Sequence, residues 1–219
     1  MAIGKVRYYF WAINRRKMLD KLLENNIHHF QGVVLDIGGR DRGRFKKPKN
    51  RVKQWIFADI DEKHHPDVVL DVTDMGKLEN ESIDTICANE LFEHVNYPEK
   101  GISECHRILK RDGTMIISAP FLFSIHADPC DYQRWTEEKW KLVLKDAGFQ
   151  IEKIIVMGYF FTAFCDISKT AIKQAGKFRY FFYPLYPIFD LLAILDKLPL
   201  VKRNGLAKSA GGYFIIVKK

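Results

Sequence analysis

The sequence has few cysteines, and their spacing fits neither a zinc site nor a redox pair. Cys87, Cys105, Cys130 and Cys165 form no C-x-x-C pair, and no Cys/His cluster has the spacing of zinc ligands. Reduced thiols in a cytoplasmic protein are the simplest interpretation. We therefore predict no metal site from the sequence.

Long apolar runs are also missing. No uninterrupted apolar run is long enough to span a bilayer. The basic N-terminal stretch MAIGKVRYYFWAINRRKMLD has neither the apolar region nor the small-residue cleavage site of a signal peptide. We expect a cytoplasmic protein, with a peripheral position at the inner face of the membrane as an open alternative.

The composition indicates a folded domain with an anionic partner. The chain has 219 residues, of which 47% are hydrophobic and 28% charged, which suits one α/β domain with some additional structure. The formal net charge of +8 favours contact with phosphate, nucleic acid or lipid headgroups, without choosing among them.

Short apolar runs alternate with helical patterns through the first 150 residues, which predicts a parallel sheet covered on both faces. Helical structure is expected over residues 5–30, a helix after Pro98, and a helix from Thr136 to a glycine stop at Gly148. Strands are expected at 33–37, 54–60, 68–70, 83–88, 114–120, 149–158 and 211–219.

This pattern divides the chain into four parts. We predict an N-terminal helical segment (1–31), a core (32–158), a helical aromatic insertion (159–210) and a final strand of the core sheet (211–219). The insertion is interpreted as a lid, a contact in a homodimer or an interfacial membrane segment, because its aromatic residues are interleaved with lysines.

The first strand runs into a glycine turn of the kind that opens a nucleotide-like site. Gly38 and Gly39 let the backbone approach a ligand, and Asp36 precedes them. Asp59 ends the second strand, where an acid can bind both hydroxyls of a ribose. The G-x-G-x-x-G pattern of a pyrophosphate site is missing. A ligand with a ribose but no pyrophosphate, such as S-adenosylmethionine (SAM), fits this combination.

At this point the chain resembles a known family. The segments VVLDIGG, FADID, VVLDVTD, SIDTICANELFEHV, EKGISECHRILKRDGTMIISAP and RWTEEKWKLVLKDAGFQIEKI follow one another as the motifs of class I SAM-dependent methyltransferases do, and most closely those of the type 11 subgroup. The resemblance implies a Rossmann-like, seven-stranded, mostly parallel sheet with helices on both faces and an antiparallel last strand. It also implies SAM as the cofactor.

The resemblance assigns cofactor contacts to particular residues. It implies the methionine end of SAM for Asp36, Gly38 and Gly39, the ribose for Asp59, the adenine for Ile60, Asp71 and Val72, and the amino acid part for Asn89 and Glu90. Glu93 and His94 match an "EH" pair that opens the next helix. Arg40 and Arg42 stand where the family has glycines.

The stretch PFLFSIHADPCDYQRWT, after the fifth strand, is the candidate for the chemistry. His126 can act as a base near neutral pH, and Asp128 can orient it. Tyr132, Arg134 and Trp135 are the candidate acceptor-binding residues. A polar loop that only supports the next helix is an equal alternative.

This loop is similar to that of methyltransferases associated with surface-polysaccharide or glycolipid synthesis. The similarity implies O-methylation of a small-molecule or glycan hydroxyl, with an anionic acceptor.

Two other functions stay open. An RNA methyltransferase is supported by charge alone, and the strand-end sequence ANELFEH lacks the D/N-P-P-Y/F loop of enzymes that methylate base amines. A non-catalytic SAM-binding or partner-binding module is the other alternative. His64 is assigned no role, and we expect His94 to support a helix start.

Overall fold

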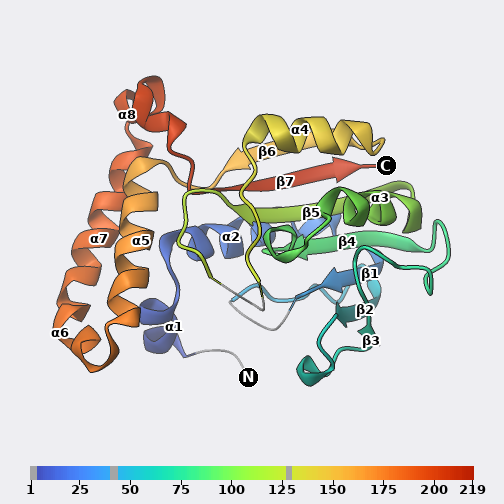
Figure 1. Ribbon diagram of the computed structural model, residues 1–219, viewed down its shortest axis with the longest axis horizontal. Helices are drawn as coiled ribbons and strands as arrows, with labels where there is room; N and C mark the ends of the chain where they lie inside the picture. The colour runs from blue at the N-terminus through green and yellow to red at the C-terminus, as the bar shows by residue number, and fades with distance from the viewer. Residues whose placement is uncertain (1–3, 40–43, 127–129) are drawn as a thin grey trace.

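The chain folds around one seven-stranded sheet. The computed structural model describes residues 4–39, 44–126 and 130–219, and Arg40, Arg42 and Asp128 lie outside the described residues. The strands run in the order β3-β2-β1-β4-β5-β7-β6 (Figure 1). Their bounds are β1 Gly32–Ile37, β2 Val52–Asp59, β3 Val68–Val69, β4 Ile83–Asn89, β5 Leu109–Pro120, β6 Gln150–Val156 and β7 Gly212–Lys218.

The direction of the strands matches the predicted fold class. Strands β1 to β5 pair in parallel, whereas β7 runs antiparallel to both neighbours, β5 and β6. The seven strands that the sequence predicts are all present, with ends that differ by a few residues. The prediction of a Rossmann-like α/β fold with an antiparallel last strand is therefore confirmed.

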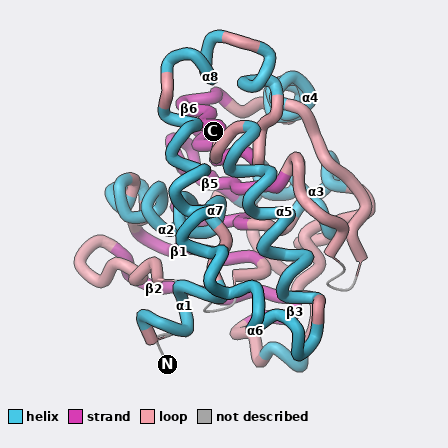
Figure 2. The backbone as a smooth tube through the Cα atoms, turned by 90° about the vertical axis from the view of Figure 1, so that its left-hand side faces the viewer, coloured by secondary structure: helices cyan, strands magenta, loops and turns pink. Residues whose placement is uncertain are grey.

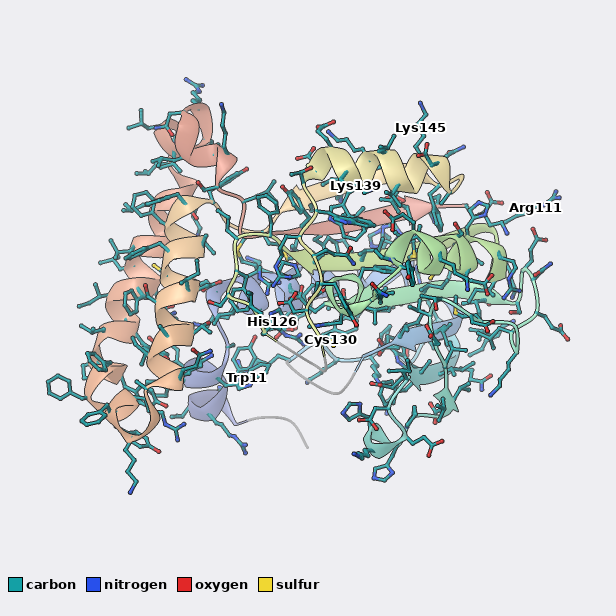
Figure 3. All side chains as sticks on the ribbon, viewed as in Figure 1. Trp11, Arg111, His126, Cys130, Lys139 and Lys145 are labelled. Carbon is teal, nitrogen blue, oxygen red and sulfur yellow. The ribbon has the colours of Figure 1, made fainter. Side chains whose placement is uncertain are left out.

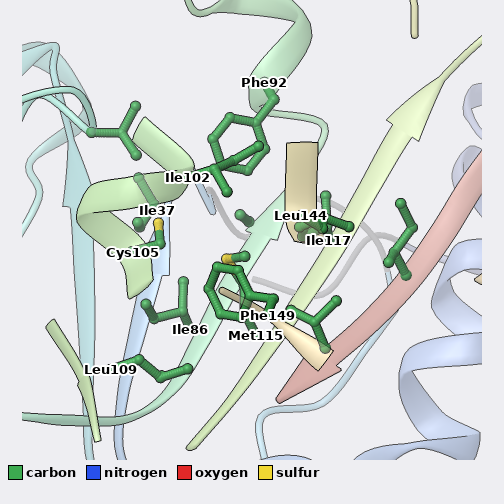
Figure 4. Packing of buried hydrophobic residues seen from close by; sticks show 14 of the residues in the cluster. Ile37, Ile86, Phe92, Ile102, Cys105, Leu109, Met115, Ile117, Leu144 and Phe149 are labelled. Carbon is green, nitrogen blue, oxygen red and sulfur yellow. The ribbon is translucent and has the colours of Figure 1, made fainter. Parts of the chain in front are cut away.

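Helices cover both faces of the sheet and enclose two apolar cores. On one face, α3 (Pro98–Ile108) and α4 (Glu137–Asp146) bury Ile102, Cys105, Leu144 and their neighbours against β4 and β5 (Figure 4). On the other face, α2 (Asn14–Asn25) buries Leu19 and Leu23 against β1 and β7. Burial on both faces explains why the central strands are almost wholly apolar.

Local signals fix the ends of α3 and α4 where the sequence places them. Pro98 occupies the first helical turn of α3, where its missing N–H has no partner to lose. The Thr136 hydroxyl accepts the backbone N–H of Lys139 at 3.3 Å. Gly148, after α4, has a φ of +92°, a conformation that suits glycine.

The helical segment expected over residues 5–30 is present and is divided into separate helices. The structure has α1 (Lys5–Trp11), a break at Ala12 and Ile13, then α2 and a short 3₁₀ helix, Ile27–His29. The buried carboxylate of Asp166 accepts the backbone N–H groups of Asn14 (2.7 Å) and Arg15 (2.8 Å). A cap from a distant helix starts α2 here, because the first N–H groups of a helix need acceptors.

A column of helices stands beyond the carboxyl ends of the parallel strands (Figure 1). It begins with α5 (Phe160–Gln174) and continues through α6 (Arg179–Phe182), α7 (Tyr186–Ala193) and α8 (Pro199–Arg203), with short 3₁₀ turns between them. Figure 2 shows α7 alongside α5. The buried Asp196 accepts the N–H groups of Tyr159 and Thr162 at the start of α5.

Candidate active site

A large cavity opens where β1, β2 and β4 end. Its volume is 1820 Å³, and α1, α2 and α5 contribute to its wall. This is the edge at which open parallel sheets bind ligands. The predicted site residues that line it are Asp36, Gly38, Gly39, Asp59, Ile60, Asp71, Val72, Asn89, Glu90, His126 and Tyr132. Arg134 and Trp135 do not line it, and Asp128 lies outside the described residues.

The bend after β1 has room for glycine alone. Gly38 has a φ of +68°, and a Cβ on it would lie 3.1 Å from Leu91. A Cβ on Gly39 would lie 1.7 Å from Oδ1 of Asp36. The indole N–H of Trp55 donates to the Asp36 carboxylate at 3.0 Å and orients it. The bend therefore presents bare backbone to the cavity.

Asp59 is aimed into the cavity by its own loop and by a histidine. Its carboxylate accepts the backbone N–H of Asp61 at 3.0 Å and lies 3.0 Å from Nδ1 of His64. A carboxylate has about four lone-pair positions, so these two contacts leave positions for two hydroxyl donors. His64 has no role predicted from the sequence, because no sequence signal places it at the strand end.

The residues expected at the adenine differ in exposure. Ile60 is exposed on the cavity wall, and Val72 belongs to the core beneath it. The Asp71 carboxylate accepts both the backbone N–H and the hydroxyl of Thr73 at 2.8 Å, which holds this turn in place. The arrangement offers an apolar surface beside an acidic edge, which suits a purine ring with an amino group.

At the end of β4, Asn89 presents an acceptor without a protein partner. Its side-chain amide donates to the Cys87 sulfur at 2.9 Å, while its buried Oδ1 atom has no hydrogen-bond partner among the described residues. A buried acceptor without a donor is costly, so this position suits a ligand with an N–H group. An ammonium group meets that requirement.

These features fit SAM. Gly38 and Gly39 allow close approach of the backbone, Asp59 keeps acceptor positions for the ribose hydroxyls, and Asn89 offers an acceptor to the amino group. When bound, SAM supplies an electrophilic methyl group on a sulfonium.

The resemblance implies a cofactor contact for the backbone at Glu90, and the Glu90 side chain has a separate set of contacts. Its carboxylate forms an ion pair with the buried Arg15 of α2 and accepts the Ser118 hydroxyl at 3.0 Å. Burial opposes the charged form of Glu90, but the charge and hydrogen bond of Arg15 outweigh burial and lower its pKa. Glu90 therefore tethers α2 to the sheet with its side chain.

The loop between β5 and α4 is fastened to the end of β4. The backbone N–H of Tyr132 donates to the Glu93 carbonyl at 2.8 Å. The side-chain amide of Gln133 donates to the carbonyls of Phe92 (2.9 Å) and Val95 (2.7 Å). These bonds bring His126 of this loop next to His94, which follows β4. Figure 3 shows His126 on the loop near Cys130.

The fastened loops gather Glu93, His94 and His126. Glu93 and His94 lie in a 3₁₀ turn, Phe92–His94, rather than opening α3 as expected. Burial, and then the nearby Glu90 charge, raise the pKa of Glu93 well above its usual range. Burial also lowers the pKa of His126, so its ring is neutral near pH 7.

The remaining residues of this loop hold the loop in place around His126. Arg134 forms an ion pair with Asp131, and Asp131 accepts the backbone N–H of His126 at 2.9 Å. The Trp135 ring packs against Trp140 of the core, with centroids 4.7 Å apart. In the described structure, Arg134 and Trp135 thus support the loop, and Tyr132 is the predicted acceptor residue that faces the cavity.

Several solved structures that are similar to this chain are methyltransferases. A SAM-dependent methyltransferase from Archaeoglobus fulgidus is 18% identical over 93% of this chain and 94% of its own, with a TM-score of 0.58. Geranyl diphosphate C-methyltransferase from Streptomyces coelicolor, solved with S-adenosyl-L-homocysteine (SAH), is 11% identical over 92% and 80%, with a TM-score of 0.59. Phosphoethanolamine N-methyltransferase 2 from Haemonchus contortus, solved with SAM, is 15% identical over 92% and 52%, with a TM-score of 0.55.

At these identities the structures establish a shared fold. Comparison with curated protein sequences gives no match. The family model of the type 11 methyltransferase domain matches residues 33–117, which include β1 to β4 and most of β5. Residues 33–117 therefore match a methyltransferase domain, and this match together with the shared fold supports a SAM-dependent methyltransferase.

Proposed function

We propose that the protein transfers the methyl group of SAM to a hydroxyl of an anionic acceptor, either a small molecule or the sugar of a glycan or glycolipid. The observation that carries the proposal is the extent of the cavity. Beyond the cofactor residues it continues along α1, α2 and the long loop, where cationic and aromatic side chains line it.

The cationic lining favours an anionic acceptor. Lys5, Lys46 and Lys100 are exposed at the cavity wall, and Lys173 of α5 faces the same space. Burial lowers the pKa of Lys173 to about 8, and its ammonium donates to the Trp11 carbonyl at 2.5 Å. A phosphate or carboxylate on the acceptor would be attracted to this wall.

The aromatic lining favours a sugar. Trp11, Tyr97 and Tyr132 line the cavity with partly exposed rings, and the Phe123 ring, also in the lining, packs against His126 with centroids 5.3 Å apart. Aromatic rings offer flat apolar faces to the C–H groups of a pyranose, while a phenolic O–H can bond its hydroxyls. The same rings also suit other small acceptors of this polarity.

His126 is the residue that we assign to the reacting hydroxyl. Its neutral ring lies at the wall of the cavity that Gly38, Asn89 and Glu90 also line. Orientation of the hydroxyl and exclusion of water supply most of the rate in a displacement of this type. Asp128, the predicted orienting residue, stays a prediction. Asp131 holds the His126 backbone in the described structure.

The function is tested with labelled SAM and a panel of acceptors: nucleotide sugars, sugar phosphates, lipid-linked saccharides and RNA. We expect label in an acidic sugar, with O-methylation located by fragmentation in a mass spectrometer. His126→Ala should lose turnover and keep SAH binding, whereas the exposed His28→Ala should keep both. Labelled RNA, with binding that falls steeply with salt, would establish an RNA methyltransferase instead. Absence of SAH binding would establish a non-catalytic module.

A second proposal concerns the segment that follows α5. Residues Gly176–Lys197 are long and apolar enough to cross a membrane by length and composition, with a mean hydropathy of 1.2, although only 6% of this stretch is buried. Large apolar side chains point outward from it, among them Phe181 (81% exposed) and Leu191 (67% exposed). Such a surface needs a partner.

We propose that this segment lies on the surface of an anionic bilayer rather than across it. Its acidic residues face the domain: Asp190 forms an ion pair with the fully buried Lys169, and Asp196 caps α5. The exposed charges of the segment, Lys177 and Lys197, are therefore basic, and the exposed Lys202, Arg203 and Lys208 follow it in the chain. Apolar side chains bordered by lysine and arginine are typical of interfacial helices.

A further inference from the structure

Two histidines and one carboxylate converge on the same point of the cavity wall. The Nε2 atoms of His94 and His126 lie 3.7 and 3.9 Å from Oε1 of Glu93. Each of the three side chains offers one ligand atom, and these atoms lie within 4.8 Å of one another. The Glu93 side chain is almost fully buried, and neither carboxylate oxygen has a hydrogen-bond partner among the described residues.

The far side of each imidazole is already occupied by an acceptor. Nδ1 of His94 lies 2.5 Å from the Cys130 carbonyl. Nδ1 of His126 lies 3.2 Å from the Ser124 carbonyl and 3.4 Å from the Asp131 carboxylate. A ring nitrogen that faces a carbonyl carries the proton, so the Nε2 atom of a neutral ring is left with a lone pair.

Lone pairs from His94 and His126 are thus directed toward the oxygens of Glu93. The separations of 3.7 and 3.9 Å are too long for hydrogen bonds, so a proton on the carboxyl does not satisfy the three groups. They lie below about 4.2 Å, twice a metal–ligand bond of roughly 2.1 Å. Inward shifts of under about 1 Å would place all three ligand atoms around one cation.

The surroundings have the form of a metal site with support behind each ligand. Histidines that bind a metal through Nε2 commonly donate Nδ1–H to a carbonyl or carboxylate, as both do here. The neighbouring charges are mixed: Arg15 and Arg134 lie near Glu93, and Glu90 offsets them. His94 and His126 line the cavity, so the open positions of a bound ion face the acceptor.

We propose that Glu93, His94 and His126 bind a divalent first-row transition cation that holds the acceptor hydroxyl. Two imidazoles and one carboxylate with open positions favour Mn²⁺, Co²⁺, Fe²⁺ or Zn²⁺ over Mg²⁺ and Ca²⁺, which prefer oxygen ligands. The inference deepens the proposed function and rests on it: His126 acts on the hydroxyl through the cation.

The proposed methyl transfer needs no oxidant or reductant. The cation accepts a lone pair of the hydroxyl oxygen, which lowers the pKa of the O–H group, and the proton passes to water in the open cavity. The oxygen then forms its bond to the methyl carbon, while the electron pair of the broken carbon–sulfur bond stays on sulfur. Glu93, His94 and His126 hold the ion and undergo no net change.

The test measures metal binding directly, on the full chain without an affinity tag and after treatment with a chelator. Mn²⁺ is titrated and the free ion followed by electron paramagnetic resonance. Co²⁺ is followed by its visible absorption, which reports imidazole coordination. We expect one ion per chain. Glu93→Gln and His126→Ala should weaken Mn²⁺ binding at least about 100-fold, and the matched His28→Ala should leave it unchanged.

Calorimetry with SAH on the same preparations distinguishes a failure of the cation inference from a failure of the proposed function. Unchanged SAH affinity in Glu93→Gln and His126→Ala shows that these variants are folded. If SAH binds the native chain and neither ion binds in a one-to-one ratio, the cation inference is wrong while the proposed function stands. Ion binding that survives both substitutions overturns the inference as well. If SAH itself does not bind, the proposed function fails, and with it the acceptor role of the ion.

Discussion

Arg15, near the start of α2, is buried and forms an ion pair with Glu90 at the end of β4. The pair joins the N-terminal helices to the sheet at the cavity wall, because both residues line that wall. The guanidinium also lies over the Phe123 ring, 4.9 Å from its centroid. One side chain of α2 therefore contacts two of the loops that form the site.

Removal of Arg15 should destabilise the fold strongly. Arg15→Ala leaves the half-buried Glu90 carboxylate without its counter-ion, which should cost up to about 3 kcal/mol, the lower end of the range for a fully buried pair. The free energy of unfolding, measured with urea, should fall by this amount. Arg111→Ala removes a guanidinium that is 88% exposed, and should change stability by less than about 0.5 kcal/mol. Equal effects of the two substitutions would show that the ion pair contributes nothing.

Asp59 should carry much of the affinity for the cofactor. Asp59→Ala removes the acceptor that we assign to the ribose hydroxyls, and should weaken SAH binding by about 1–3 kcal/mol in calorimetry. Asp61→Ala is the matched control, because Asp61 caps the turn Glu62–His64. If Asp61→Ala weakens binding and Asp59→Ala does not, the ribose contact belongs to Asp61.

The Asp131–Arg134 pair should make the loop sensitive to acid. The hydrogen bond from Arg134, opposed by burial, lowers the pKa of Asp131 to about 2, below the ordinary value of roughly 3.9. A carboxyl with a lowered pKa in the folded state stabilises that state above its ordinary pKa. This contribution is lost as the pH falls from about 4 toward 2.

The comparison of Asp131→Asn with the native chain measures this contribution. The stability difference, from urea unfolding, should be largest near pH 6 and should shrink toward zero as the pH approaches 2. Asp146→Asn, at an exposed position on α4, should show no such trend. If the difference in stability stays constant with pH, the Asp131 side chain contributes through packing and not through its charge.

The exposed segment after α5 should bind anionic vesicles. Phe181→Ser combined with Leu191→Ser should lower partitioning onto phosphatidylglycerol vesicles by at least about tenfold, because each burial contributes roughly 1.5–3 kcal/mol. Leu142→Ser changes a residue of similar exposure (55%) on α4 and should have no effect. A dimer that dissociates in the double variant, without vesicle binding, would identify a second copy of the chain as the partner.

The sheet and its ligand-binding edge could be predicted because the signals are local. A buried strand followed by Gly38-Gly39, and an acid at the end of the next strand, need no knowledge of distant residues. The structure places both in the wall of one cavity. Thr136 and Gly148 likewise mark the two ends of α4, each by its own local signal.

The remaining features depend on contacts that the sequence does not reveal. The carboxylate that starts α2 comes from Asp166, which is 152 positions from Asn14. His94 and His126 meet because Tyr132 and Gln133 fasten one loop to the other. His64 reaches Asp59 through the turn between β2 and β3. Each of these pairs follows from tertiary packing, which periodicity and spacing do not report.

The position of β7 has a consequence for the order in which the molecule assembles. β6 lies at the margin of the sheet and is joined to the rest through β7, which follows it by more than fifty residues. During synthesis, β6 must wait as an unpaired strand until the whole helical column has left the ribosome. Such late, long-range pairing slows folding and leaves an unpaired strand edge to which other chains can bind. Nascent chains of this protein should therefore be clients of chaperones until residues 212–218 insert.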